Sequence, residues 1–278
     1  MNSNICIVQP HGYIHSAAFV ELAELVAYGL QDLYHNARVT TNHIATHATN
    51  IIVGVHLLEP HLVPAVPRSS IILNTEQVWS ETPSAWKDTI FEWSRNFEVW
   101  DYSERNIERL KQVGAKNCKH LRIGFHKKLR RLAKPPTQDI DVLFYGQIND
   151  RRREIINALL ARGLQTRILV GVYGRERDAL IERSKIVLNL HQFDSKIFEV
   201  VRVFYLMTNS KAVVAEVGPE THVEPCYLAG ICASEYERLV DSCAALLSDG
   251  ERRENLEAAA LAAIRRLPQR ELLAPLIG

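Results

Sequence analysis

The sequence predicts an α/β protein built from two domains, each with its own parallel sheet. Three observations lead to this fold class. Apolar segments typical of buried strands alternate with helical segments of about a dozen residues along most of the chain. The length of 278 residues suits two domains of ~130 residues. Between the halves lies a basic, polar passage over 126–139 that contains the pair Pro135-Pro136, which cannot continue regular structure.

The first half, residues 1–125, shows its own alternation of strands and helices. Helical spacing of apolar residues follows Ser16, a typical N-cap residue, and a second capped helix ends at Gly114. A proline-rich passage over 59–70 interrupts the pattern. We expect strands over 4–10, 38–43, 50–56, 71–77, 97–103 and 117–124, and helices over 16–34, 84–97 and 103–114.

The second half, residues 140–278, repeats the alternation more clearly. The apolar strand Ile140–Gly146 leads into a polar turn and an amphipathic helix, and later strands end at Gly171 and His191. We expect strands over 140–146, 164–170, 185–191 and 212–217, and two closing helices over 236–249 and 251–267. Ligands bind outside the carboxyl ends of parallel strands, so we expect both sheets to face a cleft between the domains.

Composition points to an ordinary globular protein. The hydrophobic fraction is 47%, the charged fraction is 23% and the formal net charge is +1, which gives no global attraction to nucleic acid. No apolar run reaches the ~20 residues of a membrane-spanning helix, and no leader segment is visible. Five scattered cysteines without CxxC spacing favour a reducing compartment, so we expect a cytoplasmic protein.

The turn after the strand 140–146 is the first candidate binding site. Gly146 at the strand end allows a ligand to approach the backbone, and Gln147 follows it. The next helix offers free N–H groups to a phosphate, and Arg151 and Arg152 add bidentate contacts. Arg153 is expected to be plain surface. The alternative is an ordinary turn with solvated arginines.

A second candidate lies on the segment after the strand 185–191. Glu199 and Arg202 are three residues apart and share a face of an otherwise apolar helix, and Lys196 precedes that helix. Charged residues on a buried helix are uncommon unless they are paired or functional. The Glu199 carboxylate could accept hydrogen bonds from sugar hydroxyls, and the two cations could bind a diphosphate. This combination suits a nucleotide-sugar. Further residues expected at this binding edge are Gly171, Tyr173 and His191.

Polar residues also follow two strands of the first half. His11 comes after the strand 4–10, and Glu76 comes after the apolar core of the strand 71–77. We expect Glu76 or His11 to act as a general base on an acceptor hydroxyl. Residues expected to contact the acceptor are Tyr13, His15 and Asn74. For His11, a turn residue held by the backbone is the alternative.

Other chemistries find little support. The pairs His11–His15 and His43–His47 lack the HExxH pattern, and no Asp-x-Asp pair ends a strand, so we expect no metal ion and no other cofactor. The motifs of α/β-hydrolases, P-loop enzymes and nicotinamide dehydrogenases are absent from the sequence. The basic run 126–134 is expected to be a solvated linker face, with peripheral contact to an anionic membrane as the alternative.

Taken together, the motifs resemble those of glycosyltransferases with two Rossmann-like domains, the GT-B type, and are nearest to the group-1 family. The resemblance rests on DVLFYGQINDRRREIINAL, on KIVLNLHQFDSKIFEVVRVFYLMTNSKAVVAE and on VWDYSERNIERLKQVG. It implies that residues 140–265 bind a nucleotide diphosphate-sugar and that residues 1–125 bind a hydroxyl acceptor. Arg151 or Arg152 and Lys196 would then face the diphosphate, and Glu199 the sugar or ribose hydroxyls.

Two other functions are compatible with the same pattern. A non-catalytic two-domain protein could close on a small ligand without needing a base. A nucleotide-sugar epimerase shares the two-domain plan. The three hypotheses differ in whether the nucleotide-sugar is transferred, only bound, or isomerised.

Overall fold

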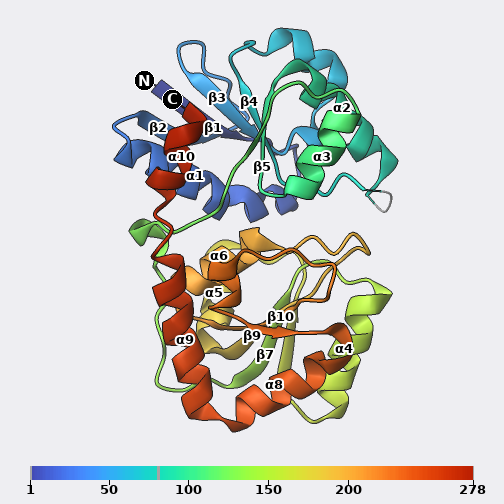
Figure 1. The fold of residues 1–278 in the computed structure, drawn as a ribbon, viewed down its shortest axis with the longest axis vertical. Helices are drawn as coiled ribbons and strands as arrows, with labels where there is room; N and C mark the ends of the chain where they lie inside the picture. Colours follow the sequence, from blue (N-terminus) through green and yellow to red (C-terminus); the bar gives the residue numbers. More distant parts are fainter. Residues whose placement is uncertain (1, 80–81, 278) are drawn as a thin grey trace. The chain divides into compact units, whose positions relative to one another are not determined.

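The computed structural model describes residues 2–79 and 82–277. The chain forms two compact α/β units (Figure 1). Unit 1 consists of residues 1–124 and 268–278, and unit 2 consists of residues 125–267. Each sheet contains parallel strands only, as the sequence predicts.

Unit 1 contains a six-stranded sheet with the order β2-β1-β3-β4-β5-β6. Its strands are β1 (Asn2–Ile7), β2 (Asn36–Thr41), β3 (Thr49–Val53), β4 (Ile71–Asn74), β5 (Glu98–Asp101) and β6 (Cys118–His120). Its helices are α1 (Val20–Asp32), α2 (Ser84–Asn96), α3 (Glu104–Gln112) and α10 (Gln269–Ile277), with 3₁₀ helices at Ile14–Phe19, Val55–Leu57 and Pro60–Ala65.

The core of unit 1 forms because its central strands are apolar on both faces. Ile52 and Val99 are fully buried, and α2 packs Trp93 against them from one side. Trp93 stacks on Phe97 with ring centroids 5.5 Å apart. The six strands thereby hold their carboxyl ends, where polar residues follow, in fixed register.

Helix α10 belongs to unit 1, whereas the prediction from the sequence placed all of residues 140–278 in the second domain. The last helix packs along α1 (Figure 1). Gly29 of α1 makes this approach possible, because a Cβ atom at that position would lie 2.6 Å from the Leu273 Cδ1 atom. The domain boundary therefore depends on a contact between residues far apart in the sequence.

Unit 2 contains a five-stranded sheet with the order β11-β10-β9-β7-β8. Its strands are β7 (Ile140–Tyr145), β8 (Thr166–Leu169), β9 (Ser184–Asn189), β10 (Ala212–Glu216) and β11 (Cys232–Ser234). Its helices are α4 (Asp150–Ala161), α5 (Gly174–Arg183), α6 (Val200–Thr208), α7 (Pro225–Leu228), α8 (Leu239–Ser248) and α9 (Gly250–Ile264), with 3₁₀ helices at Lys127–Leu129 and Tyr236–Arg238. Helices α4 and α8 share one face of the sheet.

The passage expected to be a linker, 126–139, is packed onto unit 2. Leu129 is fully buried. The Asn209 side chain accepts hydrogen bonds from the backbone of Arg131 and Leu132, at 2.8 and 2.9 Å, and donates to the Leu129 carbonyl at 2.9 Å. Lys134 pairs with Glu257 at 2.8 Å. The basic run is thus partly anchored, while Lys127, Lys128 and other cations of the run remain exposed.

Two segment boundaries differ from the expected ones. Strand β3 ends at Val53, because Gly54 turns the chain with a φ of 89°, so His56 lies on a 3₁₀ helix beyond the strand. Helix α6 begins at Val200, and residues 192–199 form an irregular loop in which Lys196 has a φ of 50°. In the described ranges, no helix has the length and apolarity needed to cross a membrane.

Candidate functional site

The candidate binding site of unit 2 lies at the carboxyl ends of β7 and β9. Strand β7 pairs with β8 on one side and with β9 on the other. The chain passes from β7 to β8 and then crosses to β9, which makes the space between the ends of β7 and β9 the topological switch point of the sheet. Open α/β sheets bind ligands at such a point. Gly146 follows β7, and His191 follows β9 closely.

Gly146 sits directly against two arginine side chains. Its φ of 140° lies in the region that favours glycine. A Cβ atom there would lie 3.0 Å from Arg202 Nη2 and 3.6 Å from Arg152 Nη1. The glycine therefore provides the room in which both guanidinium groups reach the strand end.

Arg152, Glu199 and Arg202 form one ion-pair cluster beside Gly146. Arg152 Nη2 lies 2.5 Å from Glu199 Oε1, and Arg202 Nη1 pairs with Glu199 Oε2. Arg202 also donates to Asn189 Oδ1 at 2.7 Å. Burial alone would raise the pKa of Glu199, but the two guanidinium groups outweigh it and hold that pKa below its ordinary value. Two cations share one carboxylate, so the cluster carries surplus positive charge.

The environment of Arg152 differs from the expected one. Only 1% of its side chain is exposed, and its guanidinium group donates to the Gln147 and Leu190 carbonyls at 2.8 and 2.6 Å. It therefore fixes the loop after β7 and the end of β9 instead of facing a diphosphate. Arg152 lies at the predicted strand end, but its burial does not follow from the local sequence pattern.

Arg151 forms a second ion pair at the same edge, with the buried Glu216. Its guanidinium group binds both carboxylate oxygens of Glu216 and stacks 4.0 Å from the centroid of the Tyr236 ring. His191 is buried, and its backbone N–H donates to Glu216 at 3.1 Å. Burial lowers the pKa of His191, so this histidine is neutral at pH 7.

The side chains of the other residues expected here have different surroundings. Lys196 pairs with Glu220 at 3.1 Å, and both side chains are at least one-third exposed. Gln147 is exposed in the turn after Gly146. Gly171 and Tyr173 follow β8, on the far side of β7 from β9. Arg153 is 57% exposed and pairs with Asp150, as expected of a surface residue.

Glu76 is a carboxyl group of unit 1 with a strongly raised pKa. It follows β4, and 25% of its side chain is exposed. Burial raises its pKa to about 7, although a hydrogen bond of 3.4 Å from the Thr75 hydroxyl opposes this shift. A carboxyl group that titrates near neutral pH is suited to accept a proton from a hydroxyl.

A histidine that was not predicted from the sequence lies beside Glu76. His56 Nε2 lies 3.9 Å from Glu76 Oε1. The His56 ring packs 4.7 Å from the Trp86 ring, and burial lowers its pKa to about 4, so it stays neutral. The only signal in the sequence is a histidine close to the end of an apolar segment, and the strand expected over 50–56 includes that histidine.

The remaining residues expected in unit 1 have different roles. The Tyr13 and His15 rings meet edge to face at 5.2 Å, and the Glu76 charge adds to burial in raising the pKa of Tyr13. These two residues therefore share the edge with Glu76. His11 is exposed in the turn before Tyr13, which the Tyr13 N–H closes by donating to the Pro10 carbonyl at 3.0 Å.

Asn74 is a structural residue instead of a free acceptor ligand. It is buried and donates to Asp101 Oδ2 at 2.6 Å and to the Glu76 carbonyl at 2.8 Å. Asp101 also accepts from the backbone of Ser103 at 2.7 Å and from Asn106, and burial raises its pKa to about 7. This network shapes the turn that presents Glu76.

Solved structures with the same arrangement of elements identify the fold. Anabaena HepE in complex with UDP-glucose aligns over 98% of this chain and 97% of its own, with a TM-score of 0.63 and 12% identity. T4 phage BGT in complex with its UDP-glucose substrate aligns over 99% and 98%, with a TM-score of 0.58 and 12% identity. A glycosyltransferase from Rickettsia africae aligns over 98% and 95%, with a TM-score of 0.56 and 10% identity.

The chain has the GT-B fold. Each unit corresponds to one Rossmann-like domain of that fold. The Gly146 cluster lies at the switch point of the second GT-B domain, and Glu76 lies at the carboxyl edge of the first.

Sequence comparison gives relatives without a described activity. "Uncharacterized protein L140" of Acanthamoeba polyphaga mimivirus is 26% identical over 188 residues, which span 65% of this chain and 60% of that protein. "Uncharacterized protein R358" of the same virus is 25% identical over 214 residues, 73% of each chain. No model of a known protein family matches the sequence.

Proposed function

We propose that this protein is a glycosyltransferase that moves a sugar from a nucleotide diphosphate-sugar to a hydroxyl acceptor without a metal ion. The observation that carries the proposal is the cluster of Gly146, Arg202 and Glu199 at the switch point of a GT-B domain. Support also comes from the fold, which is shared with proteins that were crystallised with UDP-glucose.

Arg202 would be the main contact of the leaving diphosphate. It lies beside Gly146, where a ligand can approach the backbone, and in the first turn of α6. Arg151 would add positive charge from the other strand end, while Glu216 and Tyr236 hold it in place.

Glu199 would have two tasks in this site. Its carboxylate holds Arg202 and Arg152 in one geometry, which prepares the arginine for the diphosphate before the ligand arrives. A carboxylate has about four sites for hydrogen bonds, so Glu199 could also accept one from a ribose or sugar hydroxyl. Lys196 and its partner Glu220 would lie at the margin of the site.

Glu76 would be the general base of the reaction. The acceptor oxygen attacks the anomeric carbon, the bond from that carbon to the diphosphate oxygen breaks, and the acceptor proton passes to the Glu76 carboxylate. The leaving nucleoside diphosphate takes both electrons of the broken bond, and the arginines stabilise its charge. His56 is neutral and therefore adds no positive charge that would lower the pKa of Glu76 from about 7.

We expect Arg202→Ala to weaken the binding of UDP-glucose by about 10–100-fold, because charge-assisted hydrogen bonds contribute about 1.5–3 kcal/mol. Isothermal titration calorimetry on the full chain measures this affinity, and circular dichroism checks the fold. Arg153→Ala is the matched control, since Arg153 is on the first turn of α4 and largely exposed. Equal affinities in the two variants would contradict the assigned contact.

Removing divalent metal should leave the transfer rate unchanged. In the proposed site Arg202 and Arg151 neutralise the diphosphate, so excess EDTA removes nothing that the reaction needs. The measurement is the rate of UDP release from UDP-glucose with an acceptor present, in EDTA and in Mn²⁺. A rate that falls to background in EDTA and returns with Mn²⁺ would reject the metal-independent mechanism.

The same assay separates transfer from the other two hypotheses. A glycosyltransferase produces a glycosylated acceptor together with UDP. A protein that only binds the nucleotide-sugar leaves it intact, and an epimerase converts it to an isomer that NMR detects without any acceptor.

A further inference from the structure

Unit 1 contains a cavity of about 510 Å³ at the edge of the sheet opposite to Glu76. It is lined by residues at the amino ends of five strands: Ser3, Thr49, Ile71, Glu98 and Lys119. None of the residues predicted from the sequence to form a site lines it. Its volume lies within the ~300–1,000 Å³ range of small-molecule sites.

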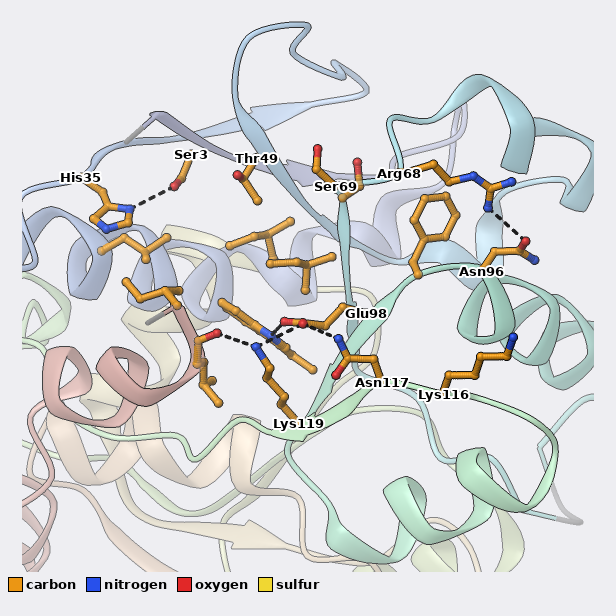
Figure 2. Close-up of a pocket in the computed structure, with 18 of the residues that line it drawn as sticks. Ser3, His35, Thr49, Arg68, Ser69, Asn96, Glu98, Lys116, Asn117 and Lys119 are labelled. Carbon is orange, nitrogen blue, oxygen red and sulfur yellow. Dashed lines mark hydrogen bonds and ion pairs between the residues drawn. The ribbon is translucent and has the colours of Figure 1, made fainter.

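Glu98 organises the polar wall of this cavity (Figure 2). Its carboxylate accepts hydrogen bonds from Trp100 Nε1 at 2.7 Å and from Asn117 Nδ2 at 2.6 Å, and it pairs with Lys119 at 3.1 Å. Lys119 also donates to the Leu276 carbonyl at 2.8 Å. The Glu98 charge is therefore compensated, and its partners are fixed in orientation before any ligand binds.

Two cations at the cavity have no carboxylate partner within the described ranges. Arg68 donates to Asn96 Oδ1 at 3.2 Å, and its guanidinium group lies 6.0 Å from the centroid of the Phe97 ring. Lys116 is exposed and lies on the same side of the pocket as Arg68 and Asn96 (Figure 2). The cavity consequently has surplus positive charge on one side.

Helix ends explain other cations here but not these two. Arg95 donates to the Val113 carbonyl at 2.9 Å and pairs with Glu92, and Lys119 binds the carbonyl near the end of α10. Arg68 and Lys116 instead lie in the loops before β4 and β6. Their charges are available to a ligand.

Hydroxyl groups complete the lining. Thr49 and Ser69 line the cavity with partly exposed and exposed side chains, and Ser3 lines it with a buried one. Ser70 also lines it, and its buried hydroxyl has no hydrogen-bond partner in the described structure. Unsatisfied buried polar groups are rare in proteins, so this hydroxyl is a candidate for a ligand oxygen.

We propose that this cavity binds a small phosphorylated and hydroxylated molecule of the sugar-phosphate type. Arg68 and Lys116 bind the phosphate, and the amide and hydroxyl groups of the lining bind the hydroxyls. The carboxylate of Glu98 is already bound by three donors, so the site serves binding and not proton transfer. The proposal does not depend on the proposed glycosyltransferase function, because the two sets of residues lie at opposite sheet edges.

Hydrogen–deuterium exchange of the full chain with glucose 1-phosphate tests the proposal. The probe should protect backbone amides in the segments 68–71, 95–98 and 116–119. Inorganic phosphate should protect the same segments more weakly, and glucose alone should not protect them. Protection by glucose equal to that by glucose 1-phosphate would overturn phosphate recognition, and protection restricted to 146–152 and 189–202 would overturn the site.

Variants provide the second arm of the experiment. The double variant Arg68→Ala/Lys116→Ala should weaken probe binding at the pocket segments by about tenfold or more, because it removes both charge-assisted contacts. Arg109→Ala/Lys111→Ala on α3 is the matched control, since neither residue lines the cavity. Equal protection in both double variants would reject the proposal. Exchange is measured separately for the pocket segments and for 146–152. A cavity that does not bind glucose 1-phosphate can therefore be distinguished from a unit 2 site that does not bind the nucleotide-sugar.

Discussion

Replacing Glu76 with glutamine should lower the rate of sugar transfer by about 10²–10⁴-fold, the usual contribution of a general base. Glutamine keeps the size and polarity of the side chain but cannot accept the proton. Donor binding should be unchanged, because the proposed diphosphate contacts are in unit 2. In the natural protein the rate should rise with pH through about 7, since the carboxylate form is the active one and its pKa is about 7.

The measurement is a pH–rate profile of transfer for both proteins, with calorimetry for UDP-glucose binding. Glu108→Gln is the matched control, because Glu108 is exposed on α3. If Glu76→Gln transfers sugar at the natural rate, Glu76 is not the base, whatever the outcome for Arg202.

The same substitution should change how stability depends on pH. The folded pKa of Glu76 is about 7, above its ordinary value of 4.5, so the folded state binds the proton more tightly than the unfolded state. Glu76 therefore reduces stability as pH rises from about 4.5 to 7. Glu76→Gln should be more stable than the natural protein at pH 8, by about 1–3 kcal/mol, with little difference at pH 4.

Urea denaturation at several pH values measures this difference. Asp101, whose pKa burial also raises to about 7, gives a slope of the same sign that persists in both proteins. The difference between the two proteins therefore isolates Glu76. A difference that stays constant from pH 4 to pH 8 would be inconsistent with its raised pKa.

Replacing Glu199 with alanine should destabilise the protein by about 3–5 kcal/mol, the range found when one partner of a buried ion pair is removed. The reason is the burial of Arg152, which is 1% exposed and would lose Glu199, its one carboxylate partner among the described residues. Arg202, which shares that carboxylate, would repel Arg152 across the vacated space. This is the largest loss of stability that we expect from a single substitution at the site.

Urea denaturation at pH 7 measures the effect. Glu220→Ala is the matched control, because the exposed pair of Glu220 and Lys196 should contribute no more than about 1 kcal/mol. Glu199→Gln should fall between the two, since it retains hydrogen bonds but loses the charge. Equal losses for Glu199→Ala and Glu220→Ala would show that the cluster does not stabilise unit 2.

The pH dependence of this effect has the opposite sign to that of Glu76. The two arginines hold the pKa of Glu199 below its ordinary value of 4.5, so its contribution is present above that value and is lost as pH falls through the folded pKa. The stability difference between the natural protein and Glu199→Ala should therefore shrink in acid.

Much of the fold could be predicted from local sequence patterns. The apolar strand over 140–146 and the capped helix after Ser103 appear in the structure close to their expected bounds, because buried strands and amphipathic helices have their own periodicities. The end of β3 was predicted too late, since only the positive φ of Gly54 stops the strand. Helix α10 was not predicted, because its place depends on the contact of Leu273 with Gly29.

The candidate site was only partly predictable. The sequence predicted that Gly146, Glu199 and Arg202 lie at the same edge of the sheet, because parallel strands bring their carboxyl ends together. In the structure the three residues are neighbours. The burial of Arg152 and the network of Asn74 depend on which side each loop folds, and the sequence does not encode that locally. Neither the contact of His56 with Glu76 nor the cavity at the opposite edge of the sheet was predicted from the sequence.

The sequence by itself therefore determined the class of fold, the two parallel sheets and the strand ends where charged residues gather. Hydrophobic periodicity and turn chemistry are local properties, and they suffice for these features. Only the tertiary structure decided which charges are paired, which are buried and which face open space. Those outcomes depend on desolvation and on distances between residues far apart in the chain, so the same arginine can bind a ligand or hold a loop according to its neighbours.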